Sequence, residues 1–324
     1  MKNLKIQIVA ISVILFSSIS VGNCQSAESF TLETLDQWME EISNWGRWGD
    51  DDQLGTLNLI TPQIRKEAAA LVKEGISVSL SMDLDVDSSL NNTQPFQHDL
   101  FRFGQWTMDT YSISYHGYTH SHIDAQRHIA HDGKIYNGYP LEDVDHIGSG
   151  NMGIHHMKNG IFTRGVLVDI PLLKGVSFLE PGTSITIADL EAWEKKSGLT
   201  VRSGDVLLIR TGRWARESEK GIWKYNENAA GLHASTAKWL KERDVAVLGS
   251  DGSADVLPSG CEGQSHPLHQ LALMGLGMPL LDNLNLEDIA KVAADLNRWE
   301  FLLVVAPLRV VGGTGSPLNP IATF

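Results

Sequence analysis

The later two thirds of the chain alternate apolar strands with helices, and this alternation restricts the fold more than any other feature. Short apolar runs predict buried strands at 205–210, 245–249 and 300–306. Helical patterns surround these strands at 186–198, 233–243, 267–276 and 286–296. Buried strands separated by helices are typical of mixed α/β proteins. We therefore expect an α/β fold, with a single mixed domain in which helices flank a β-sheet core.

Local signals fix two of the helix boundaries. Thr186 and Asp189 have the spacing of a capping box, and Gly198 is suited to end the helix that they begin. Thr61 followed by Pro62 predicts another helix start, with the helical run extending toward Gly75. Residues 78–82 alternate in polarity and predict a strand.

The charge balance restricts the class of partner. The chain has 324 residues and a formal net charge of −13, with no cluster of Lys and Arg. Because neutralising nucleic-acid phosphates requires a basic patch, we expect no nucleic-acid partner. A small-molecule substrate fits this composition better.

The N-terminus has the pattern of a secretory signal peptide. Lys2 and Lys5 precede an apolar stretch that is too short and too rich in serine to span a membrane. We expect a signal peptide at 1–24, one domain at 25–324, no membrane span, and a secreted or periplasmic protein. The sequence ending in Cys24 also resembles a bacterial lipoprotein cleavage site, so a lipid anchor is the alternative. Cys261 is the one other cysteine, which excludes a disulfide framework or a cysteine-rich zinc site.

Histidines cluster in the middle of the chain. Five of the twelve histidines lie between His116 and His131. If this segment is an extended strand, alternate residues share one face. That face would carry His116, His120, His122, Asp124 and His128. Imidazole and carboxylate ligands together suit zinc, manganese or iron, so the pattern predicts a metal or acid–base site.

The same stretch resembles the signature His-x-Gly-Thr-His-x-Asp-x-Pro-x-His of the metal-dependent cyclase and kynurenine formamidase superfamily. His122, Asp124 and His128 match its second half, whereas Gln126 replaces its proline. The first half departs, because Tyr118 stands where the signature has its first histidine. We prefer His116 as the third metal ligand, with His120 as the alternative.

Other segments extend the resemblance over residues 45–320. His269 is similar to a second family histidine, which precedes an apolar helix and then a metal-binding glutamate. Asp282 is the nearest carboxylate, at the end of an apolar segment that we expect to be helical. The alternative is that His269 packs in that helix and Asp282 caps the next one. Residues 48–58, which begin Trp-Gly, are similar to a motif of one subgroup, and the glycine-rich segment 312–317 resembles the family's last segment.

The resemblance also implies a mechanism. His116, His122 and Asp124 would hold a divalent metal (Zn or Mn), and His128 would be the general acid/base. His269 and Asp282 would contribute to a second metal position, although one ion is the simpler expectation. The implied fold is a cyclase-like swivelling β/β/α architecture, assembled as a homo-oligomer. The implied reaction is hydrolysis of a small cyclic or aryl amide, lactone or ester, as in kynurenine formamidases and isatin hydrolases.

Three other interpretations are open from the sequence. A polyketide-type cyclase could use the same metal, and a non-catalytic metal-binding protein would have no need of His128. A serine hydrolase is disfavoured, because the chain has no Gly-x-Ser-x-Gly motif. Trp45, Trp48 and Trp106 are either core residues or walls of an aromatic pocket.

Overall fold

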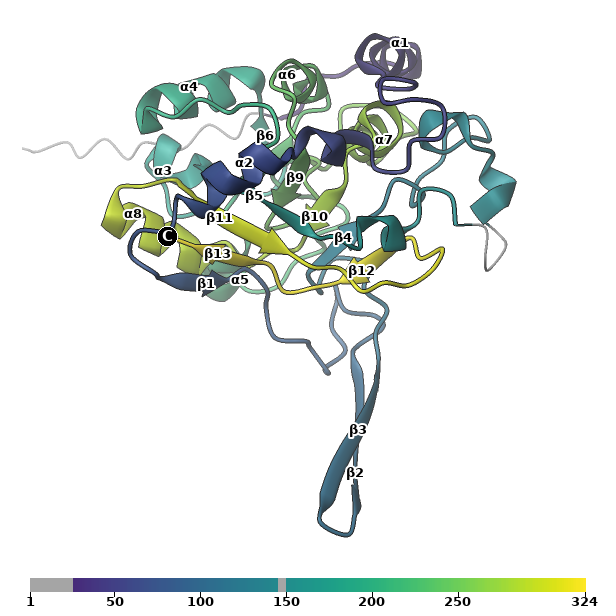
Figure 1. Cartoon of the computed structure of the whole chain (residues 1–324). Helices are drawn as coiled ribbons and strands as arrows, with labels where there is room; N and C mark the ends of the chain where they lie inside the picture. Colours follow the sequence, from purple (N-terminus) through teal and green to yellow (C-terminus); the bar gives the residue numbers. More distant parts are fainter. Residues whose placement is uncertain (1–25, 145–149) are drawn as a thin grey trace, which may run out of the picture.

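A nine-stranded sheet forms the centre of the computed structural model, which describes residues 26–144 and 150–324 (Figure 1). The strand order is β1-β13-β11-β5-β7-β9-β10-β4-β12. In chain order, these strands are β1 (Ser77–Ser79), β4 (His122–Asp124), β5 (Ile161–Asp169), β7 (Val206–Arg210), β9 (Val247–Ser250), β10 (Leu280–Asp282), β11 (Glu300–Val305), β12 (Gly315–Pro317) and β13 (Ile321–Thr323). The expected signal peptide lies outside the described residues.

The central strands are parallel and the outer strands are antiparallel. β5, β7, β9 and β10 pair in parallel, whereas β4 runs antiparallel to both β10 and β12. All five residues of β7 are buried. Burial of both faces explains why this strand consists of a continuous apolar run. The predicted mixed α/β fold is therefore confirmed.

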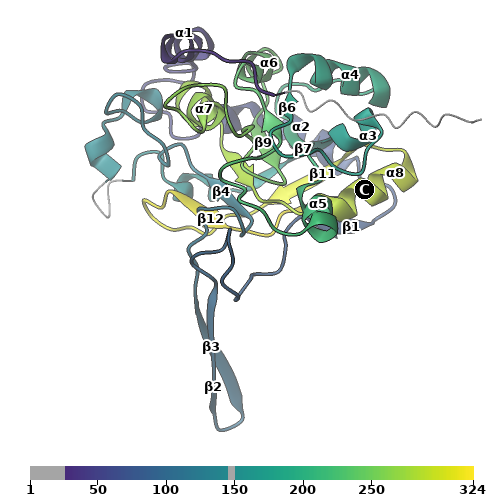
Figure 2. The same ribbon diagram turned by 180° about the vertical axis from the view of Figure 1, so that it is seen from behind.

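Helices enclose the sheet. Figures 1 and 2 both show α1, α4, α6 and α7 gathered on one side of the molecule. The α-helices are α1 (Leu32–Ile42), α2 (Pro62–Ala69), α3 (Ile170–Lys174), α4 (Ile187–Ser197), α5 (Arg213–Lys220), α6 (Thr236–Glu242), α7 (Pro267–Gln270) and α8 (Glu287–Leu296). Among the described residues, the 3-10 helices η1 to η4 lie at Gly55–Leu59, Tyr136–Gly138, Leu141–Val144 and Ile154–Met157. No helix in the described ranges is both long and apolar enough to cross a membrane.

The predicted boundaries are partly confirmed. The capping box between Thr186 and Asp189 is present at the start of α4, and Gly198 ends that helix in the left-handed region. Thr61 caps α2, but α2 ends at Ala69, well before Gly75. The predicted strand at 78–82 is β1, which is shorter and begins one residue earlier.

Two small sheets lie outside the main one. β6 (Ser184–Ile185) pairs with β8 (Gly231–Leu232). β2 (Gln97–Phe103) and β3 (Trp106–Ser112) form a hairpin that projects away from the body, on the side opposite α1, α4, α6 and α7 (Figures 1 and 2).

Two sequence expectations near the site are wrong. The segment from His116 to His128 is not one extended strand, because only His122–Asp124 pairs in the sheet and residues 116–120 form a bend. The apolar segment after His269 is a π-helix, η5 (Leu271–Leu276), and Gly277 ends it in the left-handed region. Asp282 therefore lies on the strand β10 and not on a helix, and it does not cap α8, whose N-cap is Leu286.

Candidate metal centre

β4 presents two of the predicted ligands on one face. Ile123 is fully buried in the hydrophobic core, so alternation places His122 and Asp124 on the opposite face. Asp282 of β10 lies opposite His122 in the antiparallel register and shares that face. The sheet therefore fixes three potential ligands by backbone hydrogen bonding alone.

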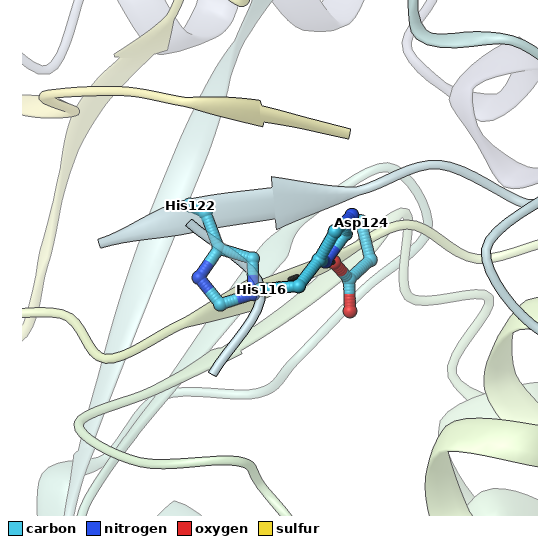
Figure 3. A group of neighbouring side chains, drawn as sticks. All are labelled: His116, His122 and Asp124. Carbon is cyan, nitrogen blue, oxygen red and sulfur yellow. Dashed lines mark ion pairs between the residues drawn. The ribbon is translucent and has the colours of Figure 1, made fainter. Parts of the chain in front are cut away.

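His116 reaches the same face through the bend before β4. Figure 3 shows its ring beside the side chains of His122 and Asp124. One donor atom from each of His116, His122 and Asp124 lies within 4.8 Å of the others, a grouping that could hold a metal ion. His116 Nδ1 is 2.9 Å from Asp124 Oδ1, and His122 Nε2 is 3.4 Å from the same oxygen.

The hydrogen-bond partners of the two imidazoles free one nitrogen on each for a cation. His122 Nδ1 donates to the carbonyl of His120 at 2.8 Å, so its Nε2 carries the lone pair in the neutral ring. His116 Nε2 is 2.9 Å from Thr314 Oγ1, and the Nδ1 atom of the same ring faces Asp124. Backbone or hydroxyl groups that orient the second nitrogen are typical of metal-bound histidines.

Buried polar atoms without partners support the same interpretation. Within the described residues, His116 Nδ1, Asp124 Oδ1 and Asp282 Oδ1 are buried and make no hydrogen bond. Leaving such atoms unsatisfied costs about 1–3 kcal/mol each. The three residues line the same cavity, and imidazole nitrogen and carboxylate oxygen are both common metal ligands. The residues present therefore fit a divalent cation.

A second group shares Asp124 with the first. Asp124, His269 and Asp282 also place one ligand atom each within 4.8 Å of one another, and all three are buried. His269 Nε2 is 3.1 Å from Asp282 Oδ2 and 3.9 Å from Asp124 Oδ2. A carboxylate between two groups of ligands can bridge two ions, so the geometry offers two adjacent metal positions.

Asp255 orients His269 and was not identified from the sequence. Its carboxylate accepts a hydrogen bond from His269 Nδ1 at 2.6 Å and from the backbone N–H groups of Leu268 and His269. A carboxylate behind a histidine is a common arrangement at metal sites. Asp255 follows the segment 250–252 at no diagnostic spacing, which is why the sequence alone did not reveal it.

The carboxylates also set the charge of the rings in this centre. Burial lowers the pKa of His269, but Asp282 and Asp255 outweigh it and raise that pKa well above the ordinary value. Burial raises the pKa of Asp124, yet the His122 and His116 rings lower it below the usual range. The centre therefore favours positive charge between ionised carboxylates.

His128 lies at the edge of the centre and not in either ligand group. Its ring stacks on His116, with centroids 3.9 Å apart, and its Nε2 is 3.9 Å from Asp124 Oδ2. Burial lowers the pKa of His128 to about 4, against the opposing effect of Asp124. Its imidazole is therefore neutral near pH 7 and free to accept a proton.

His120, the alternative third ligand, faces elsewhere. It belongs to neither group, and both ring nitrogens lack hydrogen-bond partners among the described residues. It lines a separate cavity of about 130 Å³ with residues 91–94 and 114–119. The geometry therefore favours His116, because the bend at 116–120 breaks the alternation that would have placed both histidines on one face.

Asn283 and Arg213 hold that bend in place. Asn283 Nδ2 donates to the carbonyls of Gly117 and His120, and its Oδ1 accepts a 2.6 Å hydrogen bond from Arg213. Arg213 is buried between the rings of Trp214 and Tyr225 and also donates to the carbonyl of Tyr118. The hydrogen bonds from Asn283 and Arg213 thus hold the loop that carries His116 in its bent conformation.

The glycine-rich segment 312–317 allows His116 to approach β4. Gly315 lies opposite Asp124 in the register between β12 and β4. A Cβ atom there would lie 2.3 Å from the Ile123 carbonyl oxygen and 3.1 Å from the His116 ring. A side chain at 315 would therefore push the ring of His116 away from Asp124.

The centre opens into a cavity of about 300 Å³. Beyond the ligands and His128, its walls include Tyr118, Ile129, Ser253, Gln264, His266 and Gln270. Tyr118 Oη lies 3.4 Å from His266 Nε2, and both residues line this cavity. None of the described tryptophans lines this cavity, so the interpretation of Trp45, Trp48 or Trp106 as its wall is wrong.

Comparisons with known proteins identify the family of the chain. A family described as "Putative cyclase" matches residues 76–255. A solved structure of a novel cyclase is 32% identical, with 88% of this chain and 99% of that chain covered and a TM-score of 0.79.

Isatin hydrolases have the same fold at lower identity. Isatin hydrolase A from Ralstonia solanacearum is 21% identical, covering 81% of this chain and 97% of that chain, with a TM-score of 0.55. The enzyme from Labrenzia aggregata is 20% identical, covering 79% and 94%, with a TM-score of 0.54. No curated protein matches this chain in sequence. The family match and the 32% identical structure together show that the chain belongs to the cyclase family.

Proposed function

We propose that this chain is a metal-dependent hydrolase of a small cyclic or aryl amide, lactone or ester. The observation that carries the proposal is the convergence of two ligand groups on Asp124, directly beside His128, in a cavity open to solvent. Ligands of imidazole and carboxylate type accept both zinc and manganese, and we propose one of these two as the ion. His116, His122 and Asp124 would hold it.

The chemistry requires a polarised carbonyl and an activated water. A bound divalent metal supplies both, by drawing electron density from the carbonyl oxygen and by acidifying water to a pKa near 7. The other roles belong to the protein's own residues. Asp282 and His269 form the second ligand group with Asp124, and this group would bind a second ion or lie beside the substrate carbonyl.

His128 is suited to move the proton. Because its pKa is lowered to about 4, the ring is neutral near pH 7 and accepts a proton from water on the Asp124 side of the cavity. The protonated ring then lies next to Asp124 and donates that proton to the leaving nitrogen or oxygen. Stacking on His116 holds the ring in place for both steps.

The cavity supports a small, flat substrate. Its volume of about 300 Å³ is at the lower end of small-molecule sites. Tyr118 and His266 lie with ring planes 25° apart on one wall, and Ile129 adds an apolar contact. The isatin hydrolases that share the fold support a cyclic amide as the first candidate substrate.

A substrate panel with a metal-depleted control tests this proposal. The purified protein is stripped with a chelator, reloaded with zinc or manganese, and assayed on isatin, N-formylkynurenine and simple lactones. We expect hydrolysis of at least one substrate class that is lost on stripping and restored on reloading. Ring closure in a polyketide-type substrate without hydrolysis of any panel member would show a cyclase instead. Full activity of the stripped protein would refute the metal mechanism.

His128→Gln separates catalysis from metal binding. Glutamine is close in size, but it cannot carry a proton between water and a leaving group. We expect a loss of kcat of about 100-fold or more, with the metal content unchanged. A His128→Gln protein with full activity would instead favour a non-catalytic metal-binding role for the site.

We further propose that the protein acts outside the cytoplasm and assembles as a homo-oligomer. Residues 1–24 support export, because a positive start precedes a short apolar stretch. Fusion of these residues to a reporter enzyme that folds only outside the cytoplasm tests this. An inactive fusion, retained in the cytoplasm, would contradict it.

A further inference from the structure

Two glutamine side chains belong to the part of the cavity wall that contains no metal ligand. Gln264 lies in the loop before α7, Gln270 is the last residue of that helix, and both line the cavity of the metal centre. Gln264 also lines an outer hollow of about 550 Å³, so its side chain borders both spaces. The direction in which an amide faces decides whether it offers a bound molecule a donor or an acceptor.

A chain of contacts that begins outside the cavity fixes the direction of these amides. His131 does not line the cavity, and its Nε2 lies 3.1 Å from Asp36 Oδ1 of α1 and 3.7 Å from Asp132 Oδ2. Because a carboxylate only accepts, the proton of the neutral imidazole belongs on Nε2, and Nδ1 keeps its lone pair. Gln270 Nε2 donates to that Nδ1.

The same order extends to Gln264. Since the NH2 group of Gln270 faces His131, its Oε1 accepts a hydrogen bond from Gln264 Nε2 at 2.8 Å. Gln264 Oε1 in turn accepts from the backbone N–H of His266 at 3.3 Å. Both amide oxygens are thus engaged, and each NH2 group has a second N–H beyond these contacts. The amides therefore offer donors to a molecule in the cavity.

A buried hydroxyl adds a donor to the same wall. Ser253 is 3% exposed and lines the cavity, and its Oγ makes no hydrogen bond to any described residue. A buried hydroxyl without a partner opposes folding unless water or a bound molecule completes it. A molecule with an acceptor oxygen beyond its reacting carbonyl would serve Ser253 as well as the amides.

We propose that Gln264 is a specificity-determining residue that donates a hydrogen bond to a second oxygen of the substrate, separate from the carbonyl that is attacked. Gln270 and His131 are positioning residues, which fix the direction of the Gln264 amide. A flipped amide would present its oxygen to the substrate oxygen and oppose binding. The inference rests on the proposed function and deepens it, because it selects amides, lactones and esters that carry an additional carbonyl or carboxylate oxygen.

Binding of matched probes tests the role of Gln264 without turnover. Isatin and oxindole share one bicyclic lactam, and only isatin has the second carbonyl. N-formylkynurenine and formanilide form another such pair. Calorimetry on the zinc-loaded His128→Gln protein is expected to show at least one pair in which the probe with the additional oxygen binds about tenfold more tightly. Gln264→Leu in that background is expected to reduce this ratio to about one, with the affinity for the simpler probe unchanged.

A control separates this role from a general effect of removing an amide. Gln37→Leu makes the same change on the exposed face of α1, where Gln37 donates to Glu41, and it is expected to keep the ratio. Absence of a preference in both probe pairs, or a preference that survives Gln264→Leu, would overturn the proposal.

Substitutions at His131 test the positioning role, because they leave the cavity wall itself unchanged. His131→Leu removes the acceptor for Gln270 Nε2, so both amides are free to turn, and the ratio is expected to fall by about fivefold. His131→Asn offers a side-chain oxygen to the same donor and is expected to restore most of the preference. Equal ratios in the leucine and asparagine variants would refute the positioning role.

Failure of this inference is distinguishable from failure of the proposed function. A protein that hydrolyses none of the panel but binds the probes with the expected ratio would keep the role of Gln264 and lose the assignment as a hydrolase. Hydrolysis by a protein whose ratio is unaffected by Gln264→Leu would give the opposite result.

Discussion

His116 Nδ1 lies 2.9 Å from Asp124 Oδ1, yet the two atoms do not form a hydrogen bond. Both atoms are buried, and His122 Nε2 approaches the same oxygen at 3.4 Å. A divalent cation among these ligand atoms would satisfy all of them at once. The fold of the chain alone therefore places these ligand atoms around a position suited to a metal ion.

Replacing Asp255 with asparagine is expected to weaken the second metal position. Asparagine presents an N–H group or a weaker acceptor to His269 Nδ1, and the imidazole loses the partner that fixes its orientation. We expect metal affinity to fall by about 10–100-fold at the position formed by Asp124, His269 and Asp282. Calorimetric titration of the stripped protein measures it.

The matched control for this change is Asp288→Asn, which alters an exposed carboxylate in the first turn of α8. It removes the same charge far from His269. Unchanged affinity in Asp255→Asn, relative to this control, would contradict the role of Asp255.

Thr314 is expected to act through its hydroxyl on His116. Thr314→Val keeps the shape but removes the partner of His116 Nε2, so the ring can rotate or change tautomer. We expect about tenfold weaker metal binding in the valine variant. Thr314→Ser retains the hydroxyl and is expected to bind like the wild type. Equal affinity of the valine and serine variants would rule out this role.

The fold was largely predictable wherever a local signal was strong. The capping box of Thr186 and Asp189 and the apolar runs of β7, β9 and β11 all gave correct elements. β5 was missed, although it is almost wholly buried, because Arg164 and Gly165 interrupt its apolar pattern. Arg164 is tolerated there because Asp205 and Glu300 pair with it, a long-range contact that no local pattern contains.

The site was predictable in its residue types but not in its local geometry. The even spacing of histidines and aspartate singled out His116, His122 and Asp124, whereas His269 and Asp282 were expected from the family resemblance alone. The assumption of an extended strand failed at residues 116–120, where contacts from Asn283 and Arg213 bend the chain. Such contacts join residues far apart in the sequence. The orientation of His120 away from the centre could therefore not be inferred from the alternation of side chains along a strand. Asp255 and Thr314 were missed for the same reason.

The motif at 48–58 is expected to contribute stability rather than chemistry. Gly55 has a φ of +56°, and a Cβ there would lie 2.0 Å from the Gly277 carbonyl oxygen. Gly55→Ala is therefore expected to lower the free energy of unfolding by about 3 kcal/mol or more, because both strain and overlap oppose it. Urea unfolding measures this change.

Gly49→Ala provides the comparison, since Gly49 also has a positive φ but a Cβ atom at that position would meet no atom within 4 Å. It is expected to cost only about 1–2 kcal/mol. Equal costs at positions 49 and 55 would show that the close approach to Gly277 is relieved without penalty.

Asp189 is expected to give a pH-dependent contribution to stability. Burial raises its pKa, but hydrogen bonds from Lys174 and Thr186 outweigh this and lower it. The folded state therefore favours the carboxylate, which stabilises the protein above the unfolded pKa of about 4 and ceases to do so as pH falls through the lower folded value.

Asp189→Asn is accordingly expected to lower the free energy of unfolding by about 1 kcal/mol at pH 7. The difference between the two proteins should be constant from about pH 5 to 7 and should shrink below about pH 4. Urea unfolding at several pH values measures it, and a difference that grows on acidification would contradict the sign.

Metal content across paired histidine variants tests the central claim most directly. Elemental analysis of the purified protein should find at least one equivalent of zinc or manganese per chain. His122→Ala should lose this ion, whereas His120→Ala, two residues away and outside both ligand groups, should retain it. A His122→Ala protein that keeps its full metal content would contradict the account.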